Sequence, residues 1–361
     1  MFVGQDRAVD QFSEAWKRGT LHHAWLLAGP KGVGKTTFAR EAATRVLADA
    51  AGPAVDAPGL STPKEHRIAK LVEAGSHPDL RWLERLVNSK TENLARNITV
   101  DQVRSLGDLF DLTPALSDWR VVVIDSIDDL EKSAANALLK MLEEPPANCL
   151  FLLVTHAPGR LLPTIRSRCR RLDFQTLSDD AMASILPQHV ELSDRERNQV
   201  IAAAGGSAGR ALALAQLNLI GLEEAAVAIL REGDPTNRRR SGLASELGKR
   251  GAGDRYAAFL EMLPSVVARE ARSLSGASRQ RAVEAYAKTR ELAAIAPRLS
   301  LEPASTVYPP RCGSLDGPPM PSPFQVPDQF PVCSTESKVA VARLPSSQNT
   351  IAGSVVYGSA R

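Results

Sequence analysis

The sequence predicts an α/β domain built on a parallel sheet, followed by a small and then a larger all-helical domain. Residues 24–174 alternate short apolar runs with helix-like stretches, which is the rhythm of a parallel sheet with a helix between successive strands. A glycine-rich turn directly follows the first apolar run. After Phe174 the strand signals disappear, and the chain becomes rich in alanine, leucine and arginine at helical spacing.

The composition is that of a globular protein with two or three domains, since the chain has 361 residues and is 43% apolar. A net charge of +3 permits a nucleic-acid or acidic-protein partner without favouring either. Four cysteines, at 149, 169, 312 and 333, show no CxxC spacing, so we expect reduced thiols. The first ten residues lack the apolar run of a signal peptide, and no apolar run reaches about 18 residues. We therefore expect a cytoplasmic protein that does not enter a membrane.

Three apolar runs, 24–28, 121–124 and 150–154, predict strands of the sheet. The spacing over 131–144 predicts a helix, because its apolar residues fall on one face and two prolines then end it. The residues of that face are Ala134, Leu138, Met141 and Leu142. We expect this helix to pack on the sheet.

These signals predict a first domain over 1–175 and a small helical domain over 176–218, where Ser178 and Ser193 each precede an acidic turn as helix N-caps do. A larger helical domain is expected over 219–308. Within it we predict a surface turn at 233–240 and a helix break at Pro264.

Two segments carry loop signals. Residues 51–63 are rich in proline and glycine and predict an exposed loop. Residues 309–361 predict a disordered tail rich in proline and serine, because the last 61 residues hold ten of the chain's 24 prolines and show no sustained periodicity.

The glycine-rich turn matches the phosphate-binding pattern G-x-x-x-x-G-K-[ST] in full. Its residues are Gly29, Pro30, Lys31, Gly32, Val33, Gly34, Lys35 and Thr36, with Thr37 next in the following helix. Glycines let backbone N–H groups turn towards phosphate oxygens, Lys35 supplies positive charge, and the Thr36 hydroxyl is a ligand for Mg²⁺. We expect ATP or ADP to bind here with Mg²⁺. The alternative is a glycine turn that closes a strand–helix unit and holds no ligand.

An acidic residue, Asp125, ends the apolar run 121–124, where it would hold Mg²⁺ beside the phosphate loop. Hydrolysis also needs a carboxylate to polarise the attacking water, yet the next residue is Ser126, whose hydroxyl is too weak a base. The chain's own hydrolysis should therefore be slow or absent. Asp128 and Asp129 lie beyond the strand, and we expect them to cap the following helix.

Further motifs resemble the clamp-loader family of AAA+ proteins. They are the segment 134–146, AANALLKMLEEPP, then Thr155 and Ser167-Arg168-Cys169, with Val3-Gly4-Gln5, 21–24 (LHHA) and 77–79 (HPD) earlier in the chain. The resemblance covers about 3–300. It implies that the phosphate-loop domain is of AAA+ type, that the small helical domain is a lid, and that the larger one is a collar for oligomerisation.

The resemblance also implies roles for single residues. Arg168 would be an arginine finger that acts in trans on a neighbouring subunit's nucleotide, and Thr155 would be the first sensor of the γ-phosphate. Without the resemblance, Arg168 is a solvated cation and Thr155 a strand-end hydroxyl. Gly209 stands where the family carries its second sensor arginine, and Arg210 follows one residue later.

Within the family, the absent water-activating carboxylate and the retained Arg168 are similar to the delta-prime subunits of bacterial DNA polymerase III. That likeness implies a replication protein of the polymerase holoenzyme that synthesises no DNA itself. Its implied partners are the motor (gamma/tau) and delta subunits, and, through the complex, the sliding clamp and primed DNA. Relatives carry zinc cysteines after the first helix, but 45–80 contain none, so we predict no zinc site.

Two other functions remain open from the residues. An autonomous AAA+ ATPase motor of the gamma/tau type would hydrolyse ATP with Lys35, Thr36 and Asp125, and Ser126 argues against it. A small-molecule kinase with the same loop would need an acceptor pocket and a mobile arginine lid. No signature of such a lid appears in the sequence.

Overall fold

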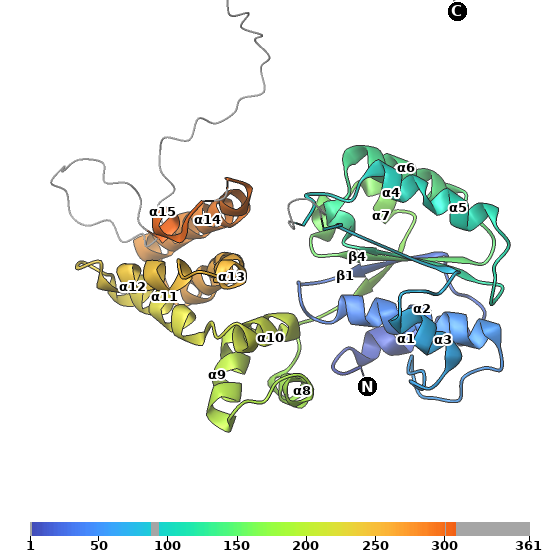
Figure 1. Ribbon diagram of the computed structural model, residues 1–361, viewed down its shortest axis with the longest axis horizontal. Helices are drawn as coiled ribbons and strands as arrows, with labels where there is room; N and C mark the ends of the chain where they lie inside the picture. Colours follow the sequence, from blue (N-terminus) through green and yellow to red (C-terminus); the bar gives the residue numbers. More distant parts are fainter. Residues whose placement is uncertain (1, 88–93, 300, 308–361) are drawn as a thin grey trace, which may run out of the picture.

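The computed structural model describes residues 2–87, 94–299 and 301–307. It contains an α/β domain and a helical region that lie beside each other (Figure 1). The predicted fold class is confirmed, since a parallel sheet with helices between its strands is followed by helices alone.

The sheet has five parallel strands in the order β2-β3-β4-β1-β5. The strands are β1 (Ala24–Ala28), β2 (Leu80–Glu84), β3 (Arg120–Asp125), β4 (Cys149–Thr155) and β5 (Arg170–Asp173). The three predicted strands are confirmed; they are the central ones, and β1 and β4 are buried along their whole length. The edge strands β2 (LRWLE) and β5 (RRLD) carry charges and expose part of their length, so a hydrophobic pattern does not reveal them.

Helices cover both faces of the sheet, as Figure 1 shows. One face packs against α1 (Asp6–Lys17), α2 (Lys35–Ala51) and α3 (Arg67–Glu73). The other packs against α4 (Val100–Arg104), α5 (Leu106–Asp111), α6 (Lys132–Glu143) and α7 (Pro163–Arg166). Because the two apolar layers enclose the sheet, the ends of its strands are where polar side chains and loops gather.

Helix α6 forms where the apolar spacing predicted it. Ala134, Leu138 and Leu142 are buried against the sheet, while Met141 is half-buried at the margin. The helix ends at Glu143, two residues before the first proline. The helix follows β3 and precedes β4, and so runs from the carboxyl ends of the strands back to their amino ends.

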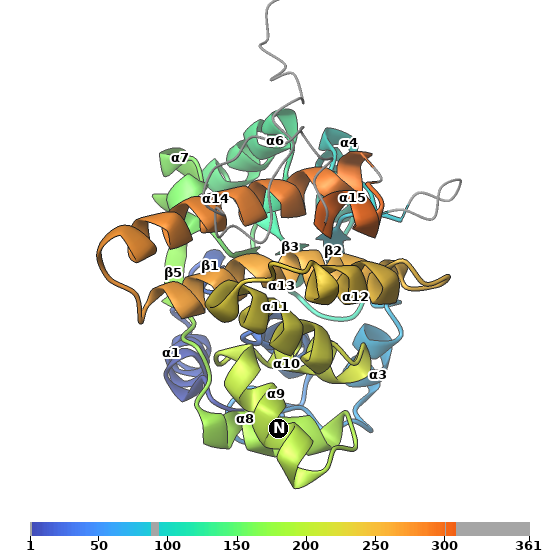
Figure 2. The same ribbon diagram turned by 90° about the vertical axis from the view of Figure 1, so that its left-hand side faces the viewer.

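The helical region begins after Phe174. Its helices are α8 (Asp179–Ile185), α9 (Asp194–Ala204), α10 (Ala208–Gln216), α11 (Ile220–Glu232), α12 (Arg238–Leu247), α13 (Gly253–Ala271), α14 (Gly276–Leu299) and α15 (Pro303–Val307). Both predicted N-caps are confirmed, since Ser178 accepts from Ala181 N–H and Ser193 forms a capping box with Glu196. One apolar cluster runs from Leu177 to Ala296, and α13 and α14 lie side by side in it (Figure 2).

The predicted helix break at Pro264 is wrong. Pro264 lies inside α13, which continues to Ala271. Leu263, Val266 and Val267 are buried on both sides of the proline, so packing of this face holds the helix together although the proline ring removes one backbone hydrogen bond. The turn predicted at 233–240 is shorter, because α12 already begins at Arg238.

The loop predicted at 51–63 follows the end of α2 and is mostly exposed, with Leu60 buried beneath it. Its shape is held by the buried guanidinium of Arg45, which pairs with Asp49 at 2.8 Å. The same guanidinium donates to loop carbonyls, those of Val55 (2.6 Å), Ala57 (3.0 Å) and Ser61 (3.0 Å). Over the residues that the structure describes, no group of three or more His, Cys, Asp or Glu side chains could hold a metal ion.

In the described segments no single helix is long and apolar enough to span a membrane. The pair α10 and α11 passes the test of length and composition only when the two are joined across a bend of 105°, and their apolar residues belong to the helical core. Cys149 and Cys169 are free thiols. The tail predicted at 309–361, with Cys312 and Cys333, lies outside the described residues.

Candidate nucleotide site

The phosphate loop connects β1 to α2 at the carboxyl edge of the sheet. Gly32 (φ 77°) and Gly34 (φ 100°) adopt left-handed backbone conformations that a side chain would strain. The first helical hydrogen bond of α2 runs from Phe38 N–H to the Gly34 carbonyl. The N–H groups of Lys35, Thr36 and Thr37 therefore have no helical acceptor and are free to bind an anion at the helix start.

Lys35 is buried inside this loop, with 2% of its surface exposed. Its ammonium donates to the Gly29 carbonyl at 2.7 Å and to the Pro30 carbonyl. Burial lowers the pKa of Lys35 to about 8, against the opposing effect of the Asp125 and Asp128 carboxylates. The lysine is thus held by neutral carbonyls, and a phosphate would provide the full negative charge that it lacks.

Thr36 and Asp125 meet although 89 residues separate them in the sequence. The Thr36 hydroxyl donates to Oδ2 of Asp125 at 2.8 Å, because β3, which ends at Asp125, lies two strands from β1 in the sheet. A hydroxyl and a carboxylate oxygen are the ligand types that Mg²⁺ prefers. With the free N–H groups of the loop, these residues would hold a Mg²⁺–nucleotide, and the metal would supply positive charge there.

Ser126 occupies the position next to Asp125 and makes no contact that activates water. Its hydroxyl donates to Oδ2 of Asp128 at 2.9 Å and accepts from the Asp128 N–H at 3.1 Å. Asp128 also accepts from the Thr155 hydroxyl at 2.8 Å and from the His156 N–H at 2.6 Å. Asp128 therefore joins the ends of β3 and β4.

The expectation that Asp128 and Asp129 cap the following helix is wrong. They lie in a short 3-10 turn, Ile127–Asp129, and the N-cap position of α6 is Glu131. Asp129 pairs with Arg85 at 3.2 Å, and burial raises the pKa of its carboxyl. The contacts of Asp128 with Thr155 and His156 are not evident from the sequence, because these partners lie 27 and 28 positions further along the chain.

The helical region touches the phosphate loop directly. The Ser207 hydroxyl donates to the Lys31 carbonyl at 3.0 Å, and Gly209 N–H donates to the Gly32 carbonyl at 2.9 Å. The Lys31 ammonium also pairs with Glu261 of α13. The loop thus keeps its N–H groups for an anion while its carbonyls hold the start of α10.

Arg210, the arginine that follows Gly209, pairs with Glu223 of α11 at 3.7 Å. Glu223 is buried and also pairs with Arg269 of α13 at 2.7 Å. Burial lowers the pKa of the Arg210 guanidinium, with the Glu223 carboxylate opposing that shift. Arg210 therefore ties α10 into the helical core, and Gly209 presents only backbone to the loop.

Arg168 lies at the opposite edge of the sheet from the phosphate loop. It precedes β5, whose Arg170 pairs in register with Trp25 near the start of β1. Trp25 lies four positions before Gly29 in the chain, which is about 13 Å at the rise of a parallel strand. The Arg168 guanidinium is held at that far edge by Glu143, at 2.7 Å, and by the Thr164 carbonyl, at 2.9 Å. Thr155, in contrast, ends β4 beside the loop, and its carbonyl accepts from Gly29 N–H at 3.4 Å.

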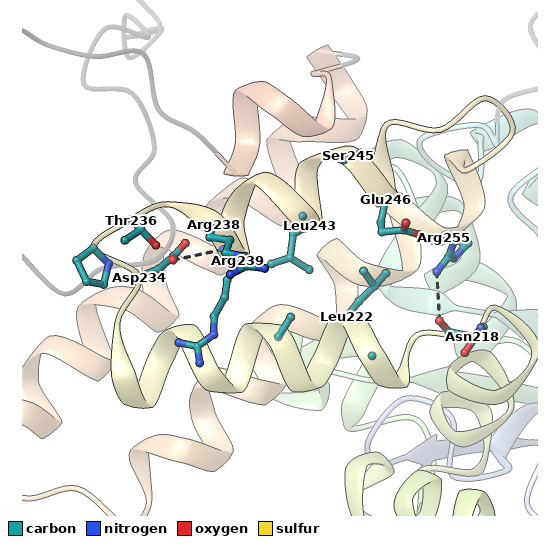
Figure 3. A pocket seen from close by; sticks show the side chains of 14 residues that line it. Asn218, Leu222, Asp234, Thr236, Arg238, Arg239, Leu243, Ser245, Glu246 and Arg255 are labelled. Atoms are coloured by element: carbon teal, nitrogen blue, oxygen red, sulfur yellow. Dashed lines mark hydrogen bonds and ion pairs between the residues drawn. The ribbon is translucent and has the colours of Figure 1, made fainter.

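A groove of about 850 Å³ lies elsewhere, between α11 and α12 (Figure 3). Two of its charged side chains, Asp234 and Arg255, are held by nearby backbone groups. Asp234 accepts from the N–H groups of Arg239 and Arg240, and Arg255 donates to the Asn218 carbonyl at 3.3 Å and faces Glu246 at 3.8 Å. The phosphate loop, with unpaired N–H groups and a buried lysine, is the better candidate site.

Gln5 is a further residue at this site that the sequence analysis did not single out for a role. Its side chain donates to the carbonyls of Val33, at 3.3 Å, and Gln175, at 2.7 Å, and accepts from Gln175 N–H. It joins the chain start to the phosphate loop and to the segment leading into the helical region. The sequence signal for this role of Gln5 is the Val3-Gly4-Gln5 motif near the chain start.

A phosphate loop after β1, an acidic residue at the end of β3, the strand order β5-β1-β4-β3-β2 and a helical region seated on the loop define a P-loop domain of AAA+ type. Residues 4–178 match the family described as "DNA polymerase III, delta subunit". Over these residues the chain is similar to the delta-prime subunits of DNA polymerase III.

Individual proteins are similar to parts of this chain. The DNA polymerase III subunit delta-prime of Pseudomonas aeruginosa is 39% identical over 158 residues, 44% of this chain and 44% of the relative. The tau subunit of Bacillus subtilis is 33% identical over 198 residues, 55% of this chain and 32% of the relative. The chain thus spans less than half the length of these two relatives. A gamma subunit-related protein of Thermotoga maritima, known as a crystal structure, is 17% identical with a TM-score of 0.40, covering 79% of this chain and 92% of that one.

Proposed function

We propose that this chain is a delta-prime clamp-loader subunit of DNA polymerase III. It would bind ATP or ADP with Mg²⁺ at Gly29–Thr36, hydrolyse little or none itself, and supply Arg168 to the nucleotide of a neighbouring ATPase subunit. Its partners would be the motor subunits (gamma/tau) and delta, and through them the sliding clamp and primed DNA. The match of residues 4–178 to the DNA polymerase III delta-subunit family, and their likeness to a delta-prime subunit, support the proposal.

The position of Arg168 carries the proposal. Its guanidinium is at the amino edge of the sheet, while the phosphate loop is at the carboxyl edge. A side chain does not span the strand length between them, so Arg168 could contact only the nucleotide of another subunit. There its fixed positive charge would stabilise the charge that develops on a transferring phosphoryl group.

The chain's own site supports binding without turnover. Lys35, Thr36 and Asp125 lie together as a Mg²⁺–nucleotide requires. At the adjacent position, where a carboxylate would polarise water, Ser126 is hydrogen-bonded to Asp128. The Thr155 hydroxyl also donates to Asp128, so Thr155 would report a γ-phosphate only after giving up that bond.

The second candidate function, an autonomous AAA+ motor, is favoured by one observation, the intact Thr36–Asp125 pair. The two candidates differ in what the purified chain does alone. A motor would turn over ATP at a rate of about 1 s⁻¹ or more, within the usual range of enzymes. The proposed subunit would not.

The decisive experiment measures steady-state ATP hydrolysis by the chain alone and by the complex assembled with motor and delta subunits. Arg168→Ala should lower turnover at the neighbouring site by roughly 10³-fold or more, the usual contribution of an arginine finger. Nucleotide binding by the isolated chain should not change. Arg166→Ala, an exposed arginine two residues away, is the matched control. Full turnover in the Arg168→Ala complex would overturn the proposal.

A further inference from the structure

We propose that Glu143 is a positioning residue that holds Arg168 ready for a neighbouring subunit's nucleotide. This inference depends on the proposed function, because it assigns Glu143 a role only through Arg168. The two residues come from different elements, since Glu143 is the last residue of α6 and Arg168 lies between α7 and β5. Their contact joins Nη2 of Arg168 to Oε1 of Glu143 at 2.7 Å.

The guanidinium of Arg168 is anchored at both terminal nitrogens. Nη1 donates to the Thr164 carbonyl at 2.9 Å and contacts the Ser167 hydroxyl at 3.5 Å. Those contacts come from its own segment and leave the guanidinium plane free to rotate about one nitrogen. The bond from Nη2 to Glu143 fixes the plane, and Nε makes no contact with the described residues. A guanidinium group whose orientation is fixed before binding loses less conformational entropy when it binds a phosphate.

Glu143 is poorly placed to stabilise its own helix. A carboxylate in the last turn of a helix faces the negative end of the helix dipole, which is unfavourable. α6 is held instead by Leu138 and Leu142, which are buried against the sheet. The charge of Glu143 therefore does little for the folding of α6, and its contact with Arg168 is the interaction that the structure gives it.

The ion pair between Arg168 and Glu143 is also weak enough for Arg168 to leave it for a phosphate. The side chains of Arg168 and Glu143 are 33% and 47% exposed, so the ion pair is screened by water and weak. A weak pair orients the guanidinium in the free chain without preventing its transfer to a more highly charged phosphate. The last residue of α6 and the segment before β5 both lie at the amino edge of the sheet. Glu143 therefore orients the Arg168 guanidinium at the same edge from which Arg168 would contact a neighbouring subunit's nucleotide.

The test uses the assembled complex and compares Glu143→Gln with Glu144→Gln. Glu144 is the next residue, is also exposed, and makes no contact with a cation in the described structure, so it is a matched control. Glu143→Gln should lower kcat at the neighbouring site roughly tenfold through misplacement of the finger, with KM for ATP unchanged. Glu144→Gln should leave both constants at their wild-type values.

A double mutant separates positioning from a general structural effect. In an Arg168→Ala background, Glu143→Gln should cause no further loss, because its effect passes through Arg168. If Glu143→Gln keeps full kcat, or lowers kcat equally with and without Arg168, the inference is wrong. If Arg168→Ala itself has no effect, the proposed function fails instead, so the two failures are distinguishable.

Discussion

The Thr155 hydroxyl donates to Oδ1 of Asp128 at 2.8 Å, across the ends of β4 and β3. A hydroxyl has one proton, so while this bond exists Thr155 cannot also donate to a phosphate. Ser126 and the His156 N–H donate to the same carboxylate, which leaves Asp128 well satisfied and the bond stable. The site should therefore distinguish poorly between ATP and ADP.

The first prediction follows from that bond. Wild-type protein should bind ATP and ADP with Kd values within about threefold of each other, measured by calorimetry with Mg²⁺. Asp128→Ala frees the Thr155 hydroxyl and should raise the preference for ATP roughly fivefold, the value of one hydrogen bond. Asp128→Ala combined with Thr155→Val should remove the gain. A wild-type preference for ATP above tenfold would contradict the argument.

The second prediction concerns pH. Burial lowers the pKa of Lys35 to about 8, and bound phosphates would raise it again, so binding favours the charged lysine. Below pH 8 the free site is already charged. Above pH 8 the free lysine is mostly neutral, and Lys35 must take up a proton when the nucleotide binds. The affinity for ADP should therefore fall by up to about tenfold per pH unit. Titrations between about pH 7.5 and 9.5 test this, and Lys35→Arg, which stays charged, should show a flat profile.

The third prediction concerns the contact of the helical region with the phosphate loop. A Cβ on Gly32 would lie 2.3 Å from the Ser207 hydroxyl, and the backbone there is left-handed. Gly32→Ala should therefore displace α10 from the loop and abolish measurable nucleotide binding. Gly75→Ala is the control, because Gly75 has a similar φ (66°) and nothing within 4 Å of an added Cβ. It should cost only the backbone strain, about 1–2 kcal/mol.

The measurement for Gly32→Ala is limited proteolysis together with nucleotide binding. Cleavage near 175–178, the segment that leads into the helical region, should become faster in Gly32→Ala and not in Gly75→Ala. If both variants bind ADP equally well, steric contact with Ser207 does not determine the loop.

The fourth prediction concerns the loop after α2. Arg45 holds Asp49 and four loop carbonyls with one buried guanidinium. Arg45→Met removes the donor of the loop carbonyls and the cation beside Asp49, and should destabilise the domain by roughly 3–5 kcal/mol. Arg40→Met removes an exposed arginine of the same helix, stacked 4.7 Å from the Trp82 ring, and should cost about 1 kcal/mol or less. Thermal unfolding of both variants measures the difference, and equal Tm values would exclude an organising role for Arg45.

The central strands and the phosphate loop could be predicted from the sequence because their signals are local. β1 and β4 are buried along their length and are therefore continuous apolar runs, and each residue of the loop is specified by its own chemistry. Edge strands such as β5 are mostly exposed and carry the charges of a surface, so their pattern is not apolar. The helix continues through Pro264 for a related reason: the local tendency of proline to end a helix is outweighed by packing of the apolar residues on both sides of it.

The sequence by itself determined a phosphate loop, an acidic partner at Asp125 and a serine in place of the water-activating carboxylate. It also carried the likeness of residues 4–178 to the DNA polymerase III family, because those signals are short patterns of consecutive residues. Only the tertiary structure decided that Asp128 accepts the hydrogen bond of the Thr155 hydroxyl and that Gly209 N–H donates to the Gly32 carbonyl. It also decided that Glu143 holds Arg168 at the amino edge of the sheet. These contacts join residues up to 177 positions apart in the chain. Their geometry is set by strand order and helix packing, which no local periodicity encodes.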